Sequence, residues 1–171
     1  MPWTCVATRH APAAPAPGRT ATVPRPAWQG PSRTAGPLPD AIEEFLHYDS
    51  SVERTTNRYV AKDLELGGVH ISRGDVVGVT LGSASRDAPP AGGGDPDALN
   101  ITRPTVRHLA FGHGIHHCLG APLARLEARV ALHALLTRLP HLELAVLAES
   151  LDWFPAGMVR GVLPVRYRTQ S

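Results

Sequence analysis

Cysteine, aromatic residues and net charge are all scarce in this chain of 171 residues. Its two cysteines cannot form a disulfide framework, which favours a reducing, cytoplasmic compartment. A net charge of only +2 gives no electrostatic indication of a nucleic-acid partner. No apolar run approaches the roughly 18 residues of a membrane span, and the N-terminus lacks the apolar core of a signal peptide. What remains is one domain, for which 43% hydrophobic residues supply a core.

Proline divides the chain into two regions. Residues 1–40 contain nine of the 17 prolines, which prevent a long helix or a central strand. Residues 1–37 are therefore predicted to be a disordered Pro/Ala-rich segment. A transit peptide, or translated sequence that is not part of the ancestral gene, is an alternative interpretation of this segment. Residues 38–171 are predicted to form the folded domain.

Short apolar segments around one long helix predict an α+β fold for the second region. The long helix is expected from Gly120 to Leu139, with Pro122 in its first turn and an apolar stripe along one side. A shorter helix is expected over residues 41–48, with Asp40 as its N-cap. Short strands are expected at residues 54–59, 64–66, 69–71, 76–81, 142–146 and 162–167. The intervening residues 82–107 lack periodicity and are expected to be irregular, which compact domains keep mainly for function.

The most informative residue is Cys118, which lies in a loop rich in glycine and histidine directly before the predicted long helix. The unpartnered amides and the dipole at a helix N-terminus favour a thiolate at such a place. A thiolate is a good ligand for a soft metal. Three kinds of site use these residue types: a zinc site, a catalytic thiol and a haem–thiolate site.

Each of the three sites makes different demands on the loop. A zinc site could use His113, His116, His117 and Cys118, but the adjacent residues His117 and Cys118 do not easily converge on one tetrahedral ion. A catalytic thiol needs a base, for which His116 or His108 could serve. A haem–thiolate site needs a thiolate, amides near the sulfur, a glycine-rich loop that a flat macrocycle can approach, and cations for the propionates. The sequence supplies all four.

The residues around Cys118 resemble the haem-binding signature of the cytochromes P450, Phe-x-x-Gly-x-(Arg/His)-x-Cys-x-Gly. The matching residues are Phe111, Gly114, His116, Cys118 and Gly120.

The flanking segments resemble the same family. Residues 48–58 are similar to the segment after the K helix of soluble bacterial members, and residues 63–75 to the hairpin that follows. Residues 86–103 are similar to the meander and residues 121–127 to the start of the L helix. Residues 38–171 thus resemble a C-terminal fragment of the P450 fold: K helix, short β hairpins, meander, cysteine-ligand loop and L helix.

The resemblance implies haem b as the cofactor, with Cys118 as the axial ligand of its iron and no catalytic side chain separable from the haem. The implied cofactor-binding residues are Arg58, His108, Phe111, Gly112, Gly114, His116, Cys118 and Gly120. The implied activity is that of a monooxygenase, which oxidises a small organic substrate with dioxygen and electrons from a ferredoxin and its NAD(P)H-dependent reductase. Residues 52–56 would face the substrate, and neither nucleic acid nor membrane is expected as a partner.

Two local departures from the family concern its structural network and its meander. The K-helix motif Glu-x-x-Arg is here Glu44-x-x-His47, so that the network of Glu44, His47 and Arg103 has histidine in place of one arginine. Histidine lacks the bidentate fork of arginine, and the loss of one member of a buried charged network costs about 3–5 kcal/mol. The meander lacks an aromatic anchor and gains Gly92–Gly94, from which we expect a looser surface.

The third departure is one of extent. Residues 1–40 contain no counterpart of the family's upstream two-thirds, which includes the distal helix with its acid–alcohol pair. A truncated monooxygenase is therefore the expected interpretation. The alternative is an inactive remnant, or a haem-binding module without oxygenase activity.

Overall fold

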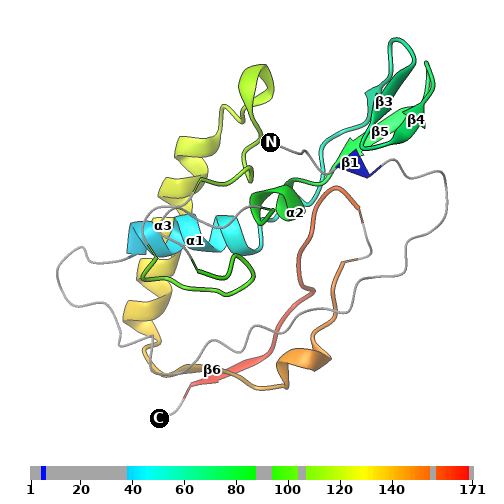
Figure 1. The fold of residues 1–171 in the computed structure, drawn as a ribbon. Coiled ribbons are helices and arrows are strands. Elements are labelled where there is room, and N and C mark those ends of the chain that lie inside the picture. Colours follow the sequence, from blue (N-terminus) through cyan, green and yellow to red (C-terminus); the bar gives the residue numbers. More distant parts are fainter. Residues whose placement is uncertain (1–4, 7–37, 88–93, 104–106, 155–156, 170–171) are drawn as a thin grey trace.

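The computed structural model in Figure 1 describes residues 5–6, 38–87, 94–103, 107–154 and 157–169. Its helices and strands are β1 (Cys5–Val6), α1 (Leu38–Tyr48), β2 (Arg58–Tyr59), β3 (Leu64–Leu66), β4 (Val69–Ile71), β5 (Val76–Val79), α2 (Leu81–Ser85), α3 (Ala121–Arg138), β6 (Leu142–Leu144) and β7 (Tyr167–Thr169). Short 3₁₀ turns lie at Gly114–His116 and Ala148–Ser150. This mixture of helices and small sheets confirms the predicted α+β class.

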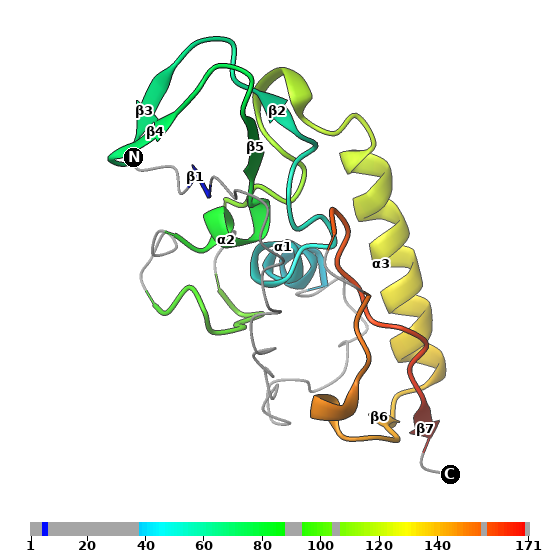
Figure 2. The ribbon, with the colours of Figure 1, turned by 90° about the vertical axis from the view of Figure 1, so that its right-hand side faces the viewer.

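Helix α1 lies at the centre of the described structure and contacts both other helices. Figure 2 shows α3 running along one side of the molecule, with α1 seen end-on beside it. Helix α1 begins at Leu38, so the prediction that Asp40 caps it from outside was wrong. Pro39 fits the first turn because its fixed φ suits a helix start, and the helix begins three residues upstream of the expected start at residue 41. Asp40 lies in the first turn, still at the positive end of the helix dipole.

The central strand of the largest sheet is β5, which pairs antiparallel with β2 on one side and with β1 on the other. The pairing with β2 confirms only the end of the strand expected at residues 54–59, although Arg54 also bridges to Thr80. The pairing with β1 was not foreseen, because Cys5 and Val6 fall in the segment predicted to be disordered. The other residues of segment 1–37 lie outside the described residues, and their disorder stays a prediction.

The β3–β4 hairpin agrees with its predicted bounds. Leu64 pairs with Ile71 and Leu66 with Val69. The two connecting residues, Gly67 and Gly68, have φ of +58° and +77°, a conformation that glycine adopts at little cost. The hairpin projects away from α3, as Figures 1 and 2 both show.

The strand expected at residues 76–81 ends two residues early, and the short helix α2 takes its place. The amides of Leu81 and Gly82 both donate to Glu53 O, at 2.8 and 3.3 Å, which turns the backbone out of the sheet. Apart from Leu81, helix α2 lies within the stretch 82–107 that was expected to be irregular. Residues 88–93 and 104–106 of that stretch lie outside the described residues.

The C-terminal strands pair in a later register than expected. Strand β6 pairs antiparallel with β7, so that Leu142 lies opposite Thr169 and Leu144 opposite Tyr167. The strand predicted at residues 162–167 contains Pro164, which has no N–H to donate, and the paired strand begins beyond it. A single bridge between Trp153 and Val162 continues the antiparallel course nearer the turn.

The predicted long helix is confirmed as α3, but its apolar stripe is not a core face within the described structure. Only Ala121 of this helix is buried. Leu123, Leu126 and Val130 of the stripe are 57%, 47% and 59% exposed. Among the described residues, no helix combines the length and the apolar character needed to span a membrane.

Candidate functional site

The loop before α3 turns sharply between Phe111 and Cys118 (Figure 1, yellow-green). The amide of Cys118 donates to Phe111 O at 2.8 Å, and the amide of Ala121 donates to Cys118 O at 3.2 Å. Gly112 makes the turn with φ of +74°, and a Cβ there would lie 3.2 Å from the carbonyl oxygen of His116. A side chain at Gly112 would therefore strain the turn. The loop carries an exposed, free Cys118 thiol to the N-terminal end of α3.

A cavity of about 770 Å³ lies beside Cys118, between the loop, α1, α3 and the segment after α1. Its volume is typical of a site for a cofactor or a small molecule. Five of the eight predicted cofactor-binding residues line it: Arg58, Phe111, Gly112, His116 and Cys118. Of residues 52–56, which were expected to face the substrate, Val52, Arg54, Thr55 and Thr56 line the same cavity.

The other three predicted residues, His108, Gly114 and Gly120, do not line this cavity. Gly114 has φ of +65° and shapes the loop, while a Cβ at Gly120 would lie 3.7 Å from the Cys118 sulfur. His108 Nε2 lies 3.0 Å from Glu43 Oε2, and its Nδ1 accepts a hydrogen bond from the amide of Ala110 at 3.2 Å. An accepting Nδ1 assigns the ring hydrogen to Nε2. Both ring nitrogens of His108 are thus engaged by protein atoms, which leaves Arg58 and His116 as the cavity-lining basic side chains of the predicted set.

Glu43 of α1 joins His108 to the long helix α3. Arg125 Nε donates to Glu43 Oε1 at 2.6 Å, and Arg125 Nη2 donates to Glu43 Oε2 at 2.9 Å. These Arg125 hydrogen bonds, together with His108, lower the pKa of Glu43 below its usual value although burial opposes them. The Arg125 guanidinium also stacks over the Phe111 ring, with its carbon 4.7 Å from the ring centroid. Glu43 therefore connects two helices to the loop that carries the thiol.

Glu44, the next residue of α1, belongs to a second cluster, which connects α1 to the segment 95–103. The side chains of Glu44, His47 and Arg103 are almost fully buried. Glu44 Oε2 lies 3.4 Å from Arg103 Nε and 3.7 Å from His47 Nδ1, neither with hydrogen-bond geometry. Both ring nitrogens of His47 also lack a hydrogen-bond partner, and burial lowers the pKa of the ring below its usual value. The structure thus brings the three predicted network residues together but leaves their polar atoms incompletely paired.

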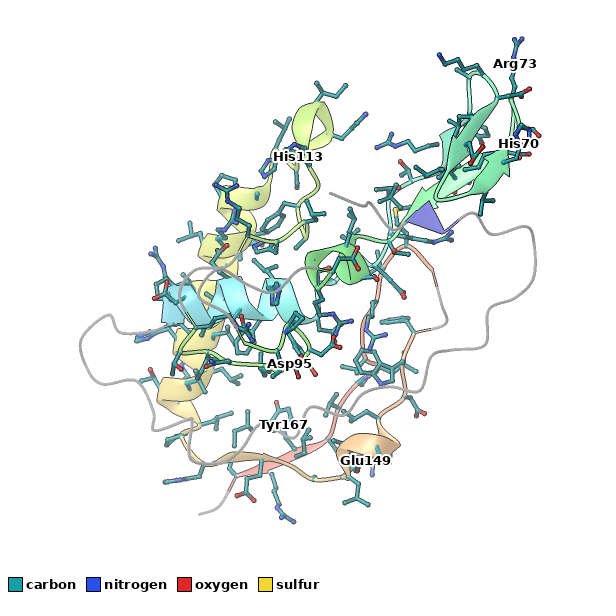
Figure 3. The ribbon with its side chains drawn as sticks, in the orientation of Figure 1. His70, Arg73, Asp95, His113, Glu149 and Tyr167 are labelled. Carbon is teal, nitrogen blue, oxygen red and sulfur yellow. The ribbon has the colours of Figure 1, made fainter. Side chains whose placement is uncertain are left out.

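The meander side of this cluster is held by backbone contacts. Arg103 Nη2 donates to the carbonyl oxygens of Asp95 and Ala98, at 2.9 and 2.7 Å, and the amide of Asn100 donates to Glu44 Oε1 at 2.8 Å. Asp95, labelled in Figure 3, lies on the segment beside α1. The predicted looseness of the meander falls mainly on residues 88–93, outside the described residues.

The zinc interpretation finds no ligand set in the part of the chain that the structure describes. No three His, Cys, Asp or Glu side chains among those residues are placed to hold a metal ion. Figure 3 shows His113 on the Cys118 loop and His70 on the distant β3–β4 hairpin. Within those residues, the exposed Cys118 thiol is not joined by two further side chains that could complete a metal site.

Known proteins share this loop and its surroundings. The family model for Cytochrome P450 matches residues 91–146. The cytochrome P450 monooxygenase PikC of Streptomyces venezuelae is 49% identical over 133 residues, which are 77% of this chain and 32% of PikC. This part of the chain is homologous to the C-terminal third of the cytochromes P450. The family resemblance predicted from the Cys118 signature is thereby confirmed.

Solved structures of cytochromes P450 agree in fold. The tirandamycin C-bound P450 monooxygenase TamI is 46% identical with a TM-score of 0.72, and the match covers 78% of this chain but 33% of TamI. The P450 PksS of Bacillus subtilis is 41% identical with a TM-score of 0.72. Among curated relatives, the 6-deoxyerythronolide B hydroxylase of Saccharopolyspora erythraea is 45% identical over 136 residues. The chain spans about a third of the length of the curated relatives it matches.

Sequence reasoning missed the role of two charged residues, Glu43 and Arg125. They lie 82 positions apart and belong to different helices, so no local pattern connects them. In the sequence, only their opposite charges indicate a possible pair, and opposite charges alone do not specify a contact. Arg54 belongs to the range 52–56 that was expected to face the substrate, and it lines the cavity and donates to Gly157 O at 3.2 Å.

Proposed function

We propose that this chain forms the thiolate side of a cytochrome P450 haem site, with Cys118 as the axial ligand of the iron. The single observation that supports this most strongly is the exposed Cys118 thiol beside a cavity of about 770 Å³ that contains the other signature residues Phe111 and His116. The donor chemistry fits, because one unpaired thiol on a glycine turn is what haem–thiolate ligation requires.

The residues around the cavity have separable roles in this proposal. Arg58 and His116 hold the propionates, since they are the cations of the predicted set that line the cavity. Gly112 keeps the backbone compact where the macrocycle approaches, and Phe111 excludes water from the sulfur. Gly114 and Gly120 act on the shape of the loop. When bound, haem supplies the redox and dioxygen chemistry, which no side chain of this chain provides.

The activity that follows is monooxygenation of a small organic substrate. Val52, Thr55 and Thr56 line the same cavity and would contact such a substrate. Electrons would come from a ferredoxin and its NAD(P)H-dependent reductase, in the cytoplasm. Haem binding without oxygenase activity is the second candidate. It is favoured by the share of the relatives that the chain spans, about a third, because activity in those relatives belongs to the whole protein.

The test is the spectrum of the full chain expressed with a haem supply. We expect the reduced, CO-bound protein to show the red-shifted Soret band from which the family takes its name. Cys118→Ala should lose this band, while the matched variant Cys5→Ser should keep it. Equal spectra for wild type and Cys118→Ala, or no retained haem, would contradict the proposal. Product formation from an organic probe, driven by a ferredoxin and its reductase, then distinguishes a monooxygenase from a binding module.

A further inference from the structure

We propose that Glu43 is a positioning residue for the Cys118 loop and acts on it through Arg125 and Phe111. The inference rests on the proposed role of Cys118 as a haem ligand and adds residues that lie outside the haem-binding signature. Neither Glu43 nor His108 lines the cavity beside the thiol, so Glu43 influences the site only through its neighbours.

The first link is the ion pair between α1 and α3. Both carboxylate oxygens of Glu43 accept from Arg125, at 2.6 and 2.9 Å, so the guanidinium plane is held in one orientation. This orientation places the Arg125 carbon 4.7 Å from the centroid of the Phe111 ring. An unpaired arginine side chain would sample many rotamers at this partly exposed position. Glu43 therefore determines where the guanidinium lies over Phe111.

The second link is Phe111 itself, which contacts both the guanidinium and the thiol segment. Its ring lies under Arg125, while its carbonyl oxygen accepts the amide of Cys118 at 2.8 Å. His108 packs against the same ring with centroids 5.9 Å apart, and its Nε2 is held by Glu43. One carboxylate thus holds two of the groups that contact the Phe111 ring. Movement of this ring would be passed to Cys118 by the backbone hydrogen bond.

The third link is electrostatic. Glu43 neutralises the Arg125 charge, which otherwise lies over the aromatic ring next to the proposed ligand. Removing the carboxylate charge leaves an uncompensated cation near the iron site. Such a cation favours the reduced state of the iron, so the reduction potential should move to a more positive value. The potential is compared in the thiolate-ligated fraction of each protein, because loss of the anionic ligand would by itself make the potential more positive.

The chain contains a matched control for this arrangement. Arg160 Nε donates to Asp49 Oδ1 at 2.8 Å, and the Arg160 guanidinium stacks 4.2 Å from the centroid of the Trp153 ring. The control pair has the same three parts, a carboxylate, an arginine and an aromatic ring, with similar exposure of the arginine. Neither Asp49 nor Arg160 lines the cavity beside Cys118. Asp49→Asn therefore reproduces the loss of an ion pair without touching the loop.

The experiment compares the full chain with its Glu43→Gln and Asp49→Asn variants, each loaded with haem. We expect Glu43→Gln to lower the thiolate-ligated fraction of the reduced CO complex several-fold and to move the reduction potential positive. Asp49→Asn should match wild type in both. Because Glu43 acts through Arg125, Glu43→Gln/Arg125→Gln should be no worse in thiolate ligation than Arg125→Gln alone. Additive losses, or equal values for Glu43→Gln and Asp49→Asn, would overturn the proposal.

A haem-free measurement separates this inference from the proposed function. If the wild-type chain retains no haem, the haem proposal fails, but the positioning of Cys118 is still measurable. The rate of Cys118 alkylation by iodoacetamide at one fixed pH, followed by peptide mass spectrometry, reports the loop directly. Glu43→Gln should change this rate several-fold and Asp49→Asn should not. Equal rates in all three proteins would sink the inference.

Discussion

Glu43 and Glu44 are neighbours on α1, and they meet different surroundings. Glu43 retains 20% exposure, and both of its oxygens accept hydrogen bonds from Arg125. Glu44 is only 2% exposed, and its Oε2 has no hydrogen-bond partner although Arg103 and His47 lie close by. The more deeply buried carboxylate is therefore the less well paired of the two. Since the penalty for an unpaired buried group rises with burial, stability should be more sensitive on the Glu44 side.

The difference between the two sides follows from His47. Its imidazole stands where the family resemblance places arginine, and neither ring nitrogen has a hydrogen-bond partner. A guanidinium carries up to five donors, and a neutral imidazole carries one. Helix α1 thus contacts the meander through a weakly paired cluster, and contacts α3 and the Cys118 loop through a well-paired one. Variants on the first side should change stability most, and variants on the second should mainly change the site.

The largest effect is expected for Arg103→Ala. Glu44 would lose its closest cation inside the protein, and the Asp95 and Ala98 carbonyl oxygens would lose their donor. We expect a loss of about 3–5 kcal/mol in the free energy of unfolding, measured by urea denaturation. Arg168→Ala, which removes a pair with Glu143 on a side chain that is 66% exposed, should cost less than about 1 kcal/mol. Equal losses in the two variants would mean that the Glu44 cluster contributes no more than a surface pair.

His47→Arg should have the opposite sign and a smaller size. A guanidinium at this position could donate to Glu44 Oε2, and a hydrogen bond to a charged group contributes about 1.5–3 kcal/mol. We expect the thermal unfolding midpoint to rise, and haem retention to rise with it. His47→Leu serves as the control, because it removes the unpartnered nitrogens without supplying a donor for Glu44. If His47→Arg were no more stable than His47→Leu, the incomplete pairing of Glu44 would not be what limits the stability of this cluster.

The sequence predicts those features that depend on residues close together along the chain, and it fails where distant residues decide the structure. The glycines at 112 and 114, Pro122 in the first turn of α3 and the apolar spacing that follows it are all local, and they predicted the loop and the long helix correctly. The same locality explains two errors. Local signals favour Asp40 as the cap because the residues before it are prolines and leucine, whereas the helix begins at Leu38. They do not indicate α2, because its turn depends on the carbonyl oxygen of Glu53, almost 30 positions away.

The charged pairs around the site join residues that lie even farther apart in the sequence. The family resemblance predicted that Glu44, His47 and Arg103 lie together, since members of the family share a three-residue network at the matching positions. No comparable pattern indicated that Glu43 holds Arg125, because a glutamate next to another glutamate on a helix is typical of a solvated face. The packing angle between α1 and α3 decides that contact, and this angle depends on the whole interface.

The smallest effects are expected from pH, and they separate the two sides again. Burial lowers the pKa of His47 below its usual value of 6.5, with Arg103, His108 and Arg86 acting in the same direction and Glu44 against it. Below pH 6.5 the unfolded chain binds a proton that the folded ring resists, so the free energy of unfolding should fall as the pH decreases from neutrality.

The hydrogen bonds from Arg125 lower the pKa of Glu43 below 4.5, so the contribution of Glu43 to stability is complete above that pH and is lost as the pH falls through the folded pKa. Urea unfolding at a series of pH values should show both losses, with His47→Leu removing the upper one and Glu43→Gln the lower one. If the free energy of unfolding of His47→Leu still fell with decreasing pH near pH 6, this loss would come from other groups. The Glu44 cluster would then not contribute to the sensitivity to acid.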